Sequence, residues 1–456
     1  LPEPLPSLGF DQYRDIRFRP DRALLGGGPF RLHLFHLGFL FQRPVTVNVV
    51  RDGVPNPIPY QPQLFDFGAH KVPSLPVNVG FAGFRLHHPL NNPRVFDEVI
   101  AFLGASYFRF LGRDQRYGIS ARGLAVNVVG PDPEEFPFFR EFWIENPPPA
   151  ADRALVYALL DGAAATGAYR FEIRPGPETA VEVGVTLFPR RTVAAMGVAP
   201  LTSMFFMGEN DRKPVDDFRP ELHDSDGLLM HAGHGEWIWR PLRNPAQKSM
   251  SSFLDTNPRG FGLLQRDRHF ESYQDLEARY HERPGYWVTP RGHWGEGRVQ
   301  LVEIPTRDET EDNVVAFWEP RHPFQPGQEI AFGYEIRAIG ATEQLHPGGR
   351  AVNTFQKPPE ASGSYAAPPD GRRFLVDFAG GDLGFQLGAP EQVEVVATTS
   401  VGEIVRTFVV PNEPIQGLRA AFDVRVPSGQ TTDLRAFLRV GERALTETWT
   451  FPWTAP

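Results

Sequence analysis

Residues 168–188 read AYRFEIRPGPETAVEVGVTLF and decide the fold class. Two short segments rich in Val, Phe, Tyr and Thr, 168–173 and 180–188, flank a turn that contains Pro175, Gly176 and Pro177. This pattern is typical of two β-strands joined by a turn. Similar turn residues recur about every ten positions along the chain, a spacing typical of an antiparallel sandwich. The sequence therefore predicts an all-β protein.

Other segments of the same composition extend this prediction over the whole chain. They are residues 31–40, 45–50, 124–129, 237–239, 299–304, 314–318 and 329–336. Helical patterns are few: residues 95–103 carry apolar side chains at helical spacing, and residues 270–280 read as a short helix that Pro284 ends. We therefore expect helix to be a minor component.

The length of the chain predicts more than one domain, because 456 residues exceed the roughly 250–300 at which a single core stops growing. Residues 357–373 are rich in Pro, Gly, Ser and Ala and lack apolar periodicity, so we expect a linker there. Residues 1–356 would then form a large β-sandwich domain. Six short strand-like segments follow in residues 374–456, as in an immunoglobulin-like sandwich without its Cys pair.

Charge and composition exclude several functions. The formal net charge of −9 argues against nucleic acid or an anionic membrane surface as the main partner. Cysteine is absent, which excludes thiol chemistry and Cys-ligated metals. No apolar run reaches the roughly 18 residues of a membrane span, and the chain starts without Met, so we expect a mature form from which a signal peptide was removed.

Histidines 223, 231 and 234 lie near Asp224 and Asp226, so a metal site has to be considered. In a strand, His231 and His234 would point to opposite faces, which favours hydrogen-bonded loop histidines instead. We therefore expect no metal and no cofactor.

Two carboxylate clusters point to sugar chemistry. Residues 219–240 carry Asp224 and Asp226 among aromatic residues, and residues 307–313 carry Asp312 directly before the strand 314–318. Acids bind hydroxyls and transfer protons, and aromatic rings stack on the apolar faces of sugars. We expect Trp237, Trp239, Trp287 and Trp318, with Asp226, to bind the sugar; packing of the tryptophans in the core is the alternative.

Several motifs resemble one known family. They are QRYGISARGL at 115–124, EEFPFFREFWIE at 134–145, FRPELHDSDGL at 218–228, NPRGFGLLQRD at 257–267 and DNVVAFW at 312–318. In order and spacing, they are similar to the periplasmic glucan biosynthesis proteins OpgG and OpgD, also called MdoG and MdoD. The acidic pair in DSD at 224–226 looks closer to the OpgD branch.

The resemblance implies a galactose mutarotase-like β-sandwich with a groove, followed by an immunoglobulin-like domain. It also implies a periplasmic enzyme that inverts the anomeric centre of β-1,2-glucan, as an endo-glucanase or as a transglycosylase that closes a ring through an α-1,6 linkage. The matched motifs make Asp312 the general acid and Asp224 the general base, with Glu309 and Tyr280 along the proton path.

A second hypothesis is a non-catalytic glucan-binding scaffold that presents chains to a membrane-bound glucan synthase. Contact with that synthase is also expected of the enzyme. The sequence does not separate hydrolysis from transfer, because the two differ only in whether water or a sugar hydroxyl reaches the anomeric carbon.

Overall fold

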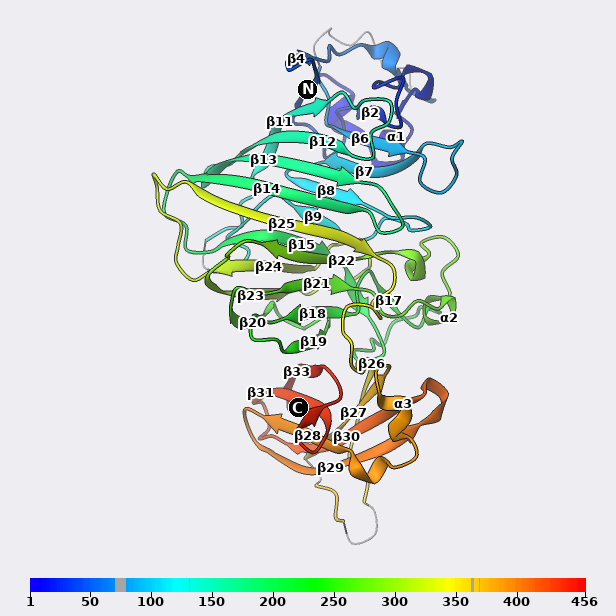
Figure 1. Ribbon diagram of the computed structural model, residues 1–456, viewed down its shortest axis with the longest axis vertical. Helices are drawn as coiled ribbons and strands as arrows, with labels where there is room; N and C mark the ends of the chain where they lie inside the picture. The colour runs from blue at the N-terminus through cyan, green and yellow to red at the C-terminus, as the bar shows by residue number, and fades with distance from the viewer. Residues whose placement is uncertain (70–78, 131, 362–364, 369) are drawn as a thin grey trace.

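The computed structural model describes residues 1–69, 79–130, 132–361, 365–368 and 370–456. Within these residues the regular structure is almost entirely β, which confirms the predicted fold class. The three α-helices found there are single turns or little more: α1 Phe10–Arg14, α2 Phe270–Tyr273 and α3 Leu383–Gln386. Figure 1 shows a large sandwich above a smaller one, with the C-terminus in the smaller.

One large sheet has ten strands. In spatial order they are β2 Arg31–Phe35, β6 Gly83–His88, β7 Asp97–Leu103, β8 Tyr107–Phe110, β9 Ser120–Arg122, β15 Met196–Ser203, β24 Val314–Pro320, β23 Glu296–Glu303 and β20 Ser249–Thr256, with β10 Ala125–Val126 beside β15.

The second large sheet has fifteen strands and runs through both sandwiches. Its order is β28 Glu394–Thr399, β31 Thr431–Val440, β33 Thr448–Thr454, β19 Trp237–Pro241, β18 Gly227–His231, β21 Gly260–Leu264, β22 Gly285–Arg291, β25 Ile330–Ile339, β14 Ala180–Pro189, β13 Ala165–Arg174, β12 Ala154–Asp161, β11 Phe138–Glu145, β3 Thr46–Arg51 and β4 Val54–Pro57, with β32 Arg443–Ala444 beside β31.

Smaller sheets complete the fold. A four-stranded sheet has the order β26 Arg350–Lys357, β27 Gly371–Ala379, β30 Gly417–Arg425 and β29 Glu403–Asn412. Two pairs stand apart: β1 Arg17–Phe18 with β5 Phe65–Asp66, and β16 Phe205–Met207 with β17 Leu222–His223.

The hairpin predicted at 168–188 is present as β13 and β14, which pair antiparallel from Ala165 with Pro189 to Arg174 with Ala180. Along β14, buried and less buried residues alternate, as a half-buried strand requires. The predicted helix at 95–103 is wrong, because this segment is strand β7, in which Val99, Ile100 and Phe102 are buried. Short apolar runs do not by themselves separate a buried strand from a helix.

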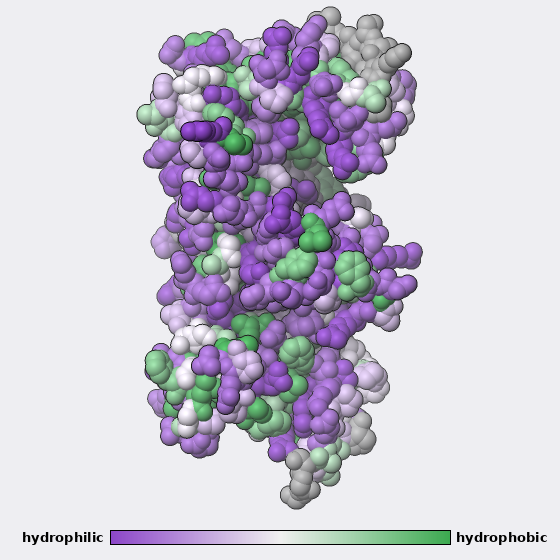
Figure 2. Space-filling model, turned by 90° about the vertical axis from the view of Figure 1, so that its right-hand side faces the viewer, coloured by the Kyte–Doolittle hydropathy of each residue, from purple (hydrophilic) through white to green (hydrophobic). Residues whose placement is uncertain are grey.

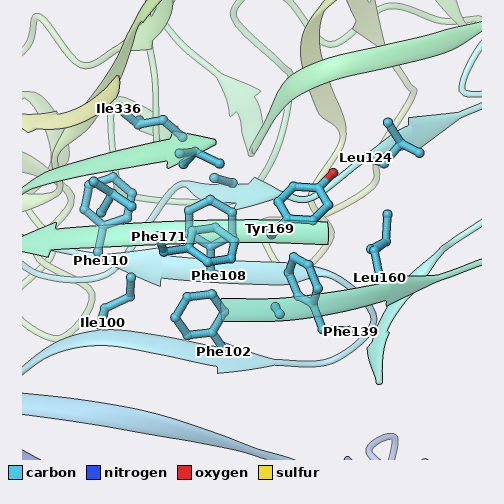
Figure 3. Packing of buried hydrophobic residues seen from close by; sticks show 14 of the residues in the cluster. Ile100, Phe102, Phe108, Phe110, Leu124, Phe139, Leu160, Tyr169, Phe171 and Ile336 are labelled. Atoms are coloured by element: carbon cyan, nitrogen blue, oxygen red, sulfur yellow. The ribbon is translucent and has the colours of Figure 1, made fainter. Parts of the chain in front are cut away.

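The core of the large sandwich is aromatic. Phe102 and Phe108, from the ten-stranded sheet, pack edge-on against Phe171 from the fifteen-stranded sheet, with ring centroids 5.1 and 5.3 Å apart (Figure 3). Each fully buried Phe of this kind contributes about 1.5–3 kcal/mol. Because strands alternate faces, Tyr107 and Arg109 of β8 point to the opposite side of the sheet, away from this core.

The two sandwiches are joined by the parallel pairing of β19 with β33, where Trp239 stands opposite Trp449. Strand β26 ends at Lys357 and already belongs to the small sandwich. Residues 357–373, the predicted linker between domains 1–356 and 374–456, instead connect β26 to its partner β27 within the small sandwich. We propose that the two sandwiches are separate domains and that the boundary lies before β26.

Candidate active site

Asp312 is held at the start of strand β24 by its neighbour Asn313. The buried amide of Asn313 accepts a hydrogen bond from the backbone N–H of Phe205 at 2.8 Å and donates to the carbonyls of Phe205 and Ile304. Asp224 is fixed to the same short segment, because its N–H donates to the carbonyl of Met204 at 2.8 Å. The backbone at 204–205 therefore sets the positions of both predicted catalytic acids.

The side chain of Asp312 lines a cavity of about 460 Å³ on the outer face of the ten-stranded sheet. Aromatic and polar side chains share this cavity, among them Phe35, Phe41, Tyr107, Glu98 and Arg109. A second cavity of about 920 Å³ shares Leu40, Phe41, Gly104 and Ala105 with the first, so the two are adjacent, and we call them together the groove.

The pKa of Asp312 lies above its ordinary value. Desolvation of its carboxyl at the cavity wall is the main cause, although 33% of the side chain remains exposed; the guanidinium of Arg109, 3.6 Å away, opposes the shift, and the charge of Asp224 adds to it. The acids next to Asp312 in the sequence are not among the causes: Asp308 is exposed and accepts from Thr310, and Glu309 accepts from Tyr280.

Asp224 is in a very different environment. It is 4% exposed, and Arg283 donates to its carboxylate at 2.5 Å, which stabilises the negative charge. The guanidinium of Arg283 also lies over the ring of Tyr280, 4.1 Å from its centroid. The tyrosine hydroxyl in turn donates to Glu309 at 2.7 Å, and Arg219 donates to the same carboxylate at 2.8 Å.

These contacts form a continuous polar network that begins at Asp224. Burial, with the bond to Glu309 as the next cause, raises the pKa of Tyr280 above its ordinary value, so its hydroxyl keeps its proton. Sequence reasoning paired Glu309 with Tyr280 and missed Arg109, Arg219 and Arg283. The alternation of YFRF at 107–110 was the signal available for Arg109, since an Arg between two core Phe residues must point out of the core.

The four predicted sugar-binding tryptophans lie in or beside the hydrophobic cores. Trp318 is fully buried within the large sandwich, and Trp239 and Trp287 are buried at the junction of the two sandwiches. Trp237 is half-buried and stacks on His231 at 4.0 Å. Of the four, Trp237 alone keeps surface that a sugar could reach, and its contact with sugar stays a prediction.

The three histidines considered as metal ligands do not meet. His231 stacks on Trp237, and His234 is exposed near Glu236. His223 instead lies with Glu221, Asp226 and Asp267, whose candidate ligand atoms are within 4.8 Å of one another. Asp226 therefore sits in a buried polar cluster, its carboxylate accepting from the backbone N–H groups of Arg266 and Asp267.

Both ring nitrogens of His223 face side-chain oxygen atoms. Its Nδ1 donates to Gln265 at 2.9 Å and its Nε2 donates to Glu221 at 2.8 Å. Although burial opposes it, the charges of Asp226 and Glu221 raise the pKa of His223 to about 9. Burial, together with Asp226 and Glu221, raises the pKa of Asp267 as well.

Hydrophilic residues dominate the side of the molecule on which β17 and α2 project (Figure 2), and hydrophobic residues form separate small groups there. Such a surface suits a polar ligand better than an apolar protein partner.

Gly118 leaves the space that the pair of Asp224 and Arg283 occupies. A Cβ at position 118 would lie 2.9 Å from Oδ1 of Asp224 and 2.8 Å from Cδ of Arg283. If Asp224 is the base, Gly118→Ala should displace it and lower kcat by about tenfold or more. Gly184→Ala is the matched control, because its added Cβ meets nothing within 4 Å. Equal kcat in the two variants would contradict the role of Asp224.

Comparison with known proteins adds the family. The family model described as "Periplasmic glucan biosynthesis protein, MdoG" matches residues 1–453. "Probable glucans biosynthesis protein D" of Shewanella oneidensis is 47% identical over 100% of this chain and 85% of its own length. "Glucans biosynthesis protein G" of Ralstonia nicotianae is 47% identical over 99% and 91%, and the protein G of Vibrio cholerae is 43% identical over 100% and 82%.

One relative named D and one named G are both 47% identical to this chain, so identity alone does not assign the chain to one branch. No helix among the described residues is long and apolar enough to cross a membrane. The match over nearly the whole chain confirms the resemblance drawn from the motifs. The chain belongs to the family of periplasmic glucan biosynthesis proteins.

Proposed function

We propose that this protein acts in the periplasm on β-1,2-glucan and inverts the configuration of the anomeric carbon at which it reacts. The observation that carries the proposal is the contrast between two carboxyl groups. Asp312 lines a groove with aromatic and polar walls and has a raised pKa, whereas Asp224 is buried against a guanidinium. Such a contrast assigns the first group as acid and the second as base.

In this mechanism Asp312 gives its proton to the glycosidic oxygen as the bond from that oxygen to the anomeric carbon breaks. An oxygen nucleophile attacks the same carbon from the opposite face, and its proton passes to Asp224 directly or through Tyr280, bound water or a substrate hydroxyl. One bond forms and one breaks, and the proton lost by Asp312 is balanced by the proton gained by Asp224. The next cycle requires the two groups to exchange that proton with solvent.

Arg283 and Glu309 would tune the base side of this pathway. Arg283 contacts both the Asp224 carboxylate and the Tyr280 ring, and Glu309 accepts the Tyr280 hydroxyl proton in a hydrogen bond. A hydroxyl that is fixed in this way can orient a water or a sugar hydroxyl next to it.

Whether water or a sugar hydroxyl is the nucleophile decides between an endo-glucanase and a transglycosylase that forms an α-1,6 linkage. Contact with a membrane-bound glucan synthase, which would deliver or receive the glucan, is compatible with both of these activities. A scaffold without catalysis would bind linear β-1,2-glucan and leave its chain length unchanged. Incubation with that glucan, followed by chain-length and linkage analysis, separates all three.

We expect the reacted carbon to have the α configuration. A single displacement at a β-linked carbon inverts it, because no covalent enzyme intermediate turns it back. The measurement is proton NMR of the new reducing ends before mutarotation, or of the new linkage in a transfer product. A β anomer at that carbon would overturn the mechanism, even if Asp224 and Asp312 proved essential.

A further inference from the structure

A third cavity, of about 860 Å³, lies at the end of the ten-stranded sheet near strands β2 and β6. On these strands Leu32 and Leu86 point into the core. Arg31, His33, Arg85 and His87 line the cavity on the opposite face. This is also the face that carries the Asp312 cavity, since Phe35 of β2 lines that cavity in turn. The ion pair of Arg85 with Glu98, at 2.7 Å, joins the two, because Arg85 lines one cavity and Glu98 the other.

The walls of this cavity are rich in hydrogen-bond donors. Its lining includes five arginines, Arg17, Arg19, Arg31, Arg85 and Arg94. The lining contains two carboxylates, Asp21 and Asp66, and both are occupied: Asp21 lies 3.6 Å from Arg22, and Asp66 accepts the backbone N–H of Gly68 at 3.0 Å.

Two of these arginines are free to bind a ligand. Within the part of the chain that the structure describes, Arg17 and Arg94 form no ion pair, whereas Arg19 lies 4.0 Å from Asp21 and Arg85 pairs with Glu98. Arg31 is used by the protein itself, through bonds to backbone carbonyls and its position over the ring of Phe96.

The cavity wall also holds two buried imidazoles with unused nitrogens. His33 and His87 are 7% and 9% exposed, and their rings lie 4.1 Å apart. Nδ1 of His33 and Nε2 of His87 have no hydrogen-bond partner among the described residues. Buried polar atoms without partners are rare in folded proteins, and water, an ion or a ligand can satisfy them. Nδ1 of His87 donates to the carbonyl of Phe96 at 3.2 Å, so Nε2 of neutral His87 is an acceptor and the arginines are the groups that would hold an anion.

Both imidazoles are neutral in this arrangement. Burial, together with His87 and Arg85, lowers the pKa of His33 to about 3. Burial, together with Arg85, also lowers the pKa of His87. A negative charge in the cavity would remove the repulsion from Arg85 that contributes to both shifts.

We propose that this cavity is a binding site for an oxyanion, a phosphate ester or a carboxylate, which Arg17 and Arg94 hold above the pair of His33 and His87. A neutral sugar needs acceptors for its hydroxyl hydrogens, and this cavity offers mainly donors. Phosphate and carboxylate oxygens accept from the fork of an Arg side chain. The proposal does not depend on the catalytic roles of Asp224 and Asp312, because none of its residues belongs to that machinery.

The two cavities lie on one face of one sheet, so the oxyanion can be a group carried by a glucan chain whose sugars occupy the groove. A free anion from solution is the other source. Three probes distinguish them: inorganic phosphate, a neutral β-1,2-glucan oligosaccharide, and the same oligosaccharide with a phosphate ester.

The test is calorimetric titration of the whole protein with each probe, for the wild type and for the double variant Arg17→Gln/Arg94→Gln. Each lost charge-assisted bond should weaken binding about tenfold, so the double variant should bind the phosphorylated chain roughly 100-fold more weakly and the neutral chain unchanged. Arg51→Gln is the matched control, because Arg51 is an exposed residue at the end of β3 and does not line the cavity. It should bind all three probes like the wild type.

Tighter binding of the phosphorylated chain than of either other probe, lost in the double variant, supports a group carried on the chain. Phosphate binding as tight as that of the phosphorylated chain, and lost in the double variant, supports a free anion. If the phosphate group gives no added affinity, or if the double variant binds like the wild type, the proposal is wrong.

Discussion

The change of Asp312 to Asn should lower the turnover of β-1,2-glucan at least ~10²-fold, the usual contribution of a general acid. An amide of the same size cannot donate a proton to the departing oxygen, so cleavage would have to proceed through an unprotonated leaving group. Binding of the glucan should be nearly unchanged, because the aromatic and polar walls of the cavity stay in place. The measurement is kcat from chain-length analysis, together with the affinity for linear glucan by calorimetry.

Asp308→Asn is the matched control for this variant. Asp308 lies in the same loop and is exposed, and its Oδ1 accepts from the backbone N–H of Thr310, a bond that Asn can also accept. Its turnover should equal that of the wild type. Undiminished turnover in Asp312→Asn would remove Asp312 from the mechanism, and loss of binding together with turnover would make Asp312 a glucan-binding group instead of the acid.

The pattern of turns and strands was enough to predict the architecture. Strand β14 alternates buried and less buried residues along its length, which the run AVEVGVTLF makes visible in the sequence. Strand β7 was missed because its apolar residues are continuous, and only pairing with β6 and β8 decides its conformation. Pairing over long sequence separations also brings β33 beside β19, which no local pattern shows.

Only part of the site could be predicted, because some of its residues come from segments that are distant in the sequence. Motifs that are local in the chain, such as HDSDG at 223–227 and DNVVAFW at 312–318, name the acids. The cationic side chains around these acids come from distant parts of the chain: Arg109 from β8 and Arg283 from the turn before β22. The tryptophans show why a residue type alone does not predict a binding site, because a Trp ring suits both a hydrophobic core and the face of a sugar. Trp318 is fully buried and therefore belongs to the core.

The second large effect is expected at the junction of the two sandwiches, where Glu447 meets Arg266. Their side chains are 0% and 3% exposed, with N and O 2.6 Å apart, and the Arg266 guanidinium lies 3.5 Å from the centroid of the Trp239 ring. Glu447→Gln keeps the shape and leaves the arginine charge buried and uncompensated. Loss of one partner of a buried pair costs about 3–5 kcal/mol of unfolding free energy.

Glu394→Gln is the control, because Glu394 pairs with Arg439 at a similar distance, 2.9 Å, with side chains that are 60% and 43% exposed. An exposed pair of this kind contributes about 0–1 kcal/mol. Urea unfolding, followed by both tryptophan fluorescence and circular dichroism, measures the difference, and equal midpoints for the two variants would contradict it.

The junction also reaches the candidate base, so Glu447→Gln should affect turnover as well as stability. The backbone N–H of Arg266 donates to Asp226, which lies two residues from Asp224, and Glu447 also accepts from the backbone N–H of Ala351 in β26 of the small sandwich. We therefore expect the small sandwich to support the loop of Asp224 without supplying a reacting group. The expected result is a lower kcat in the folded variant at temperatures well below its unfolding transition. A folded variant with reduced stability and full kcat would show that the small sandwich stabilises the chain but does not position the base.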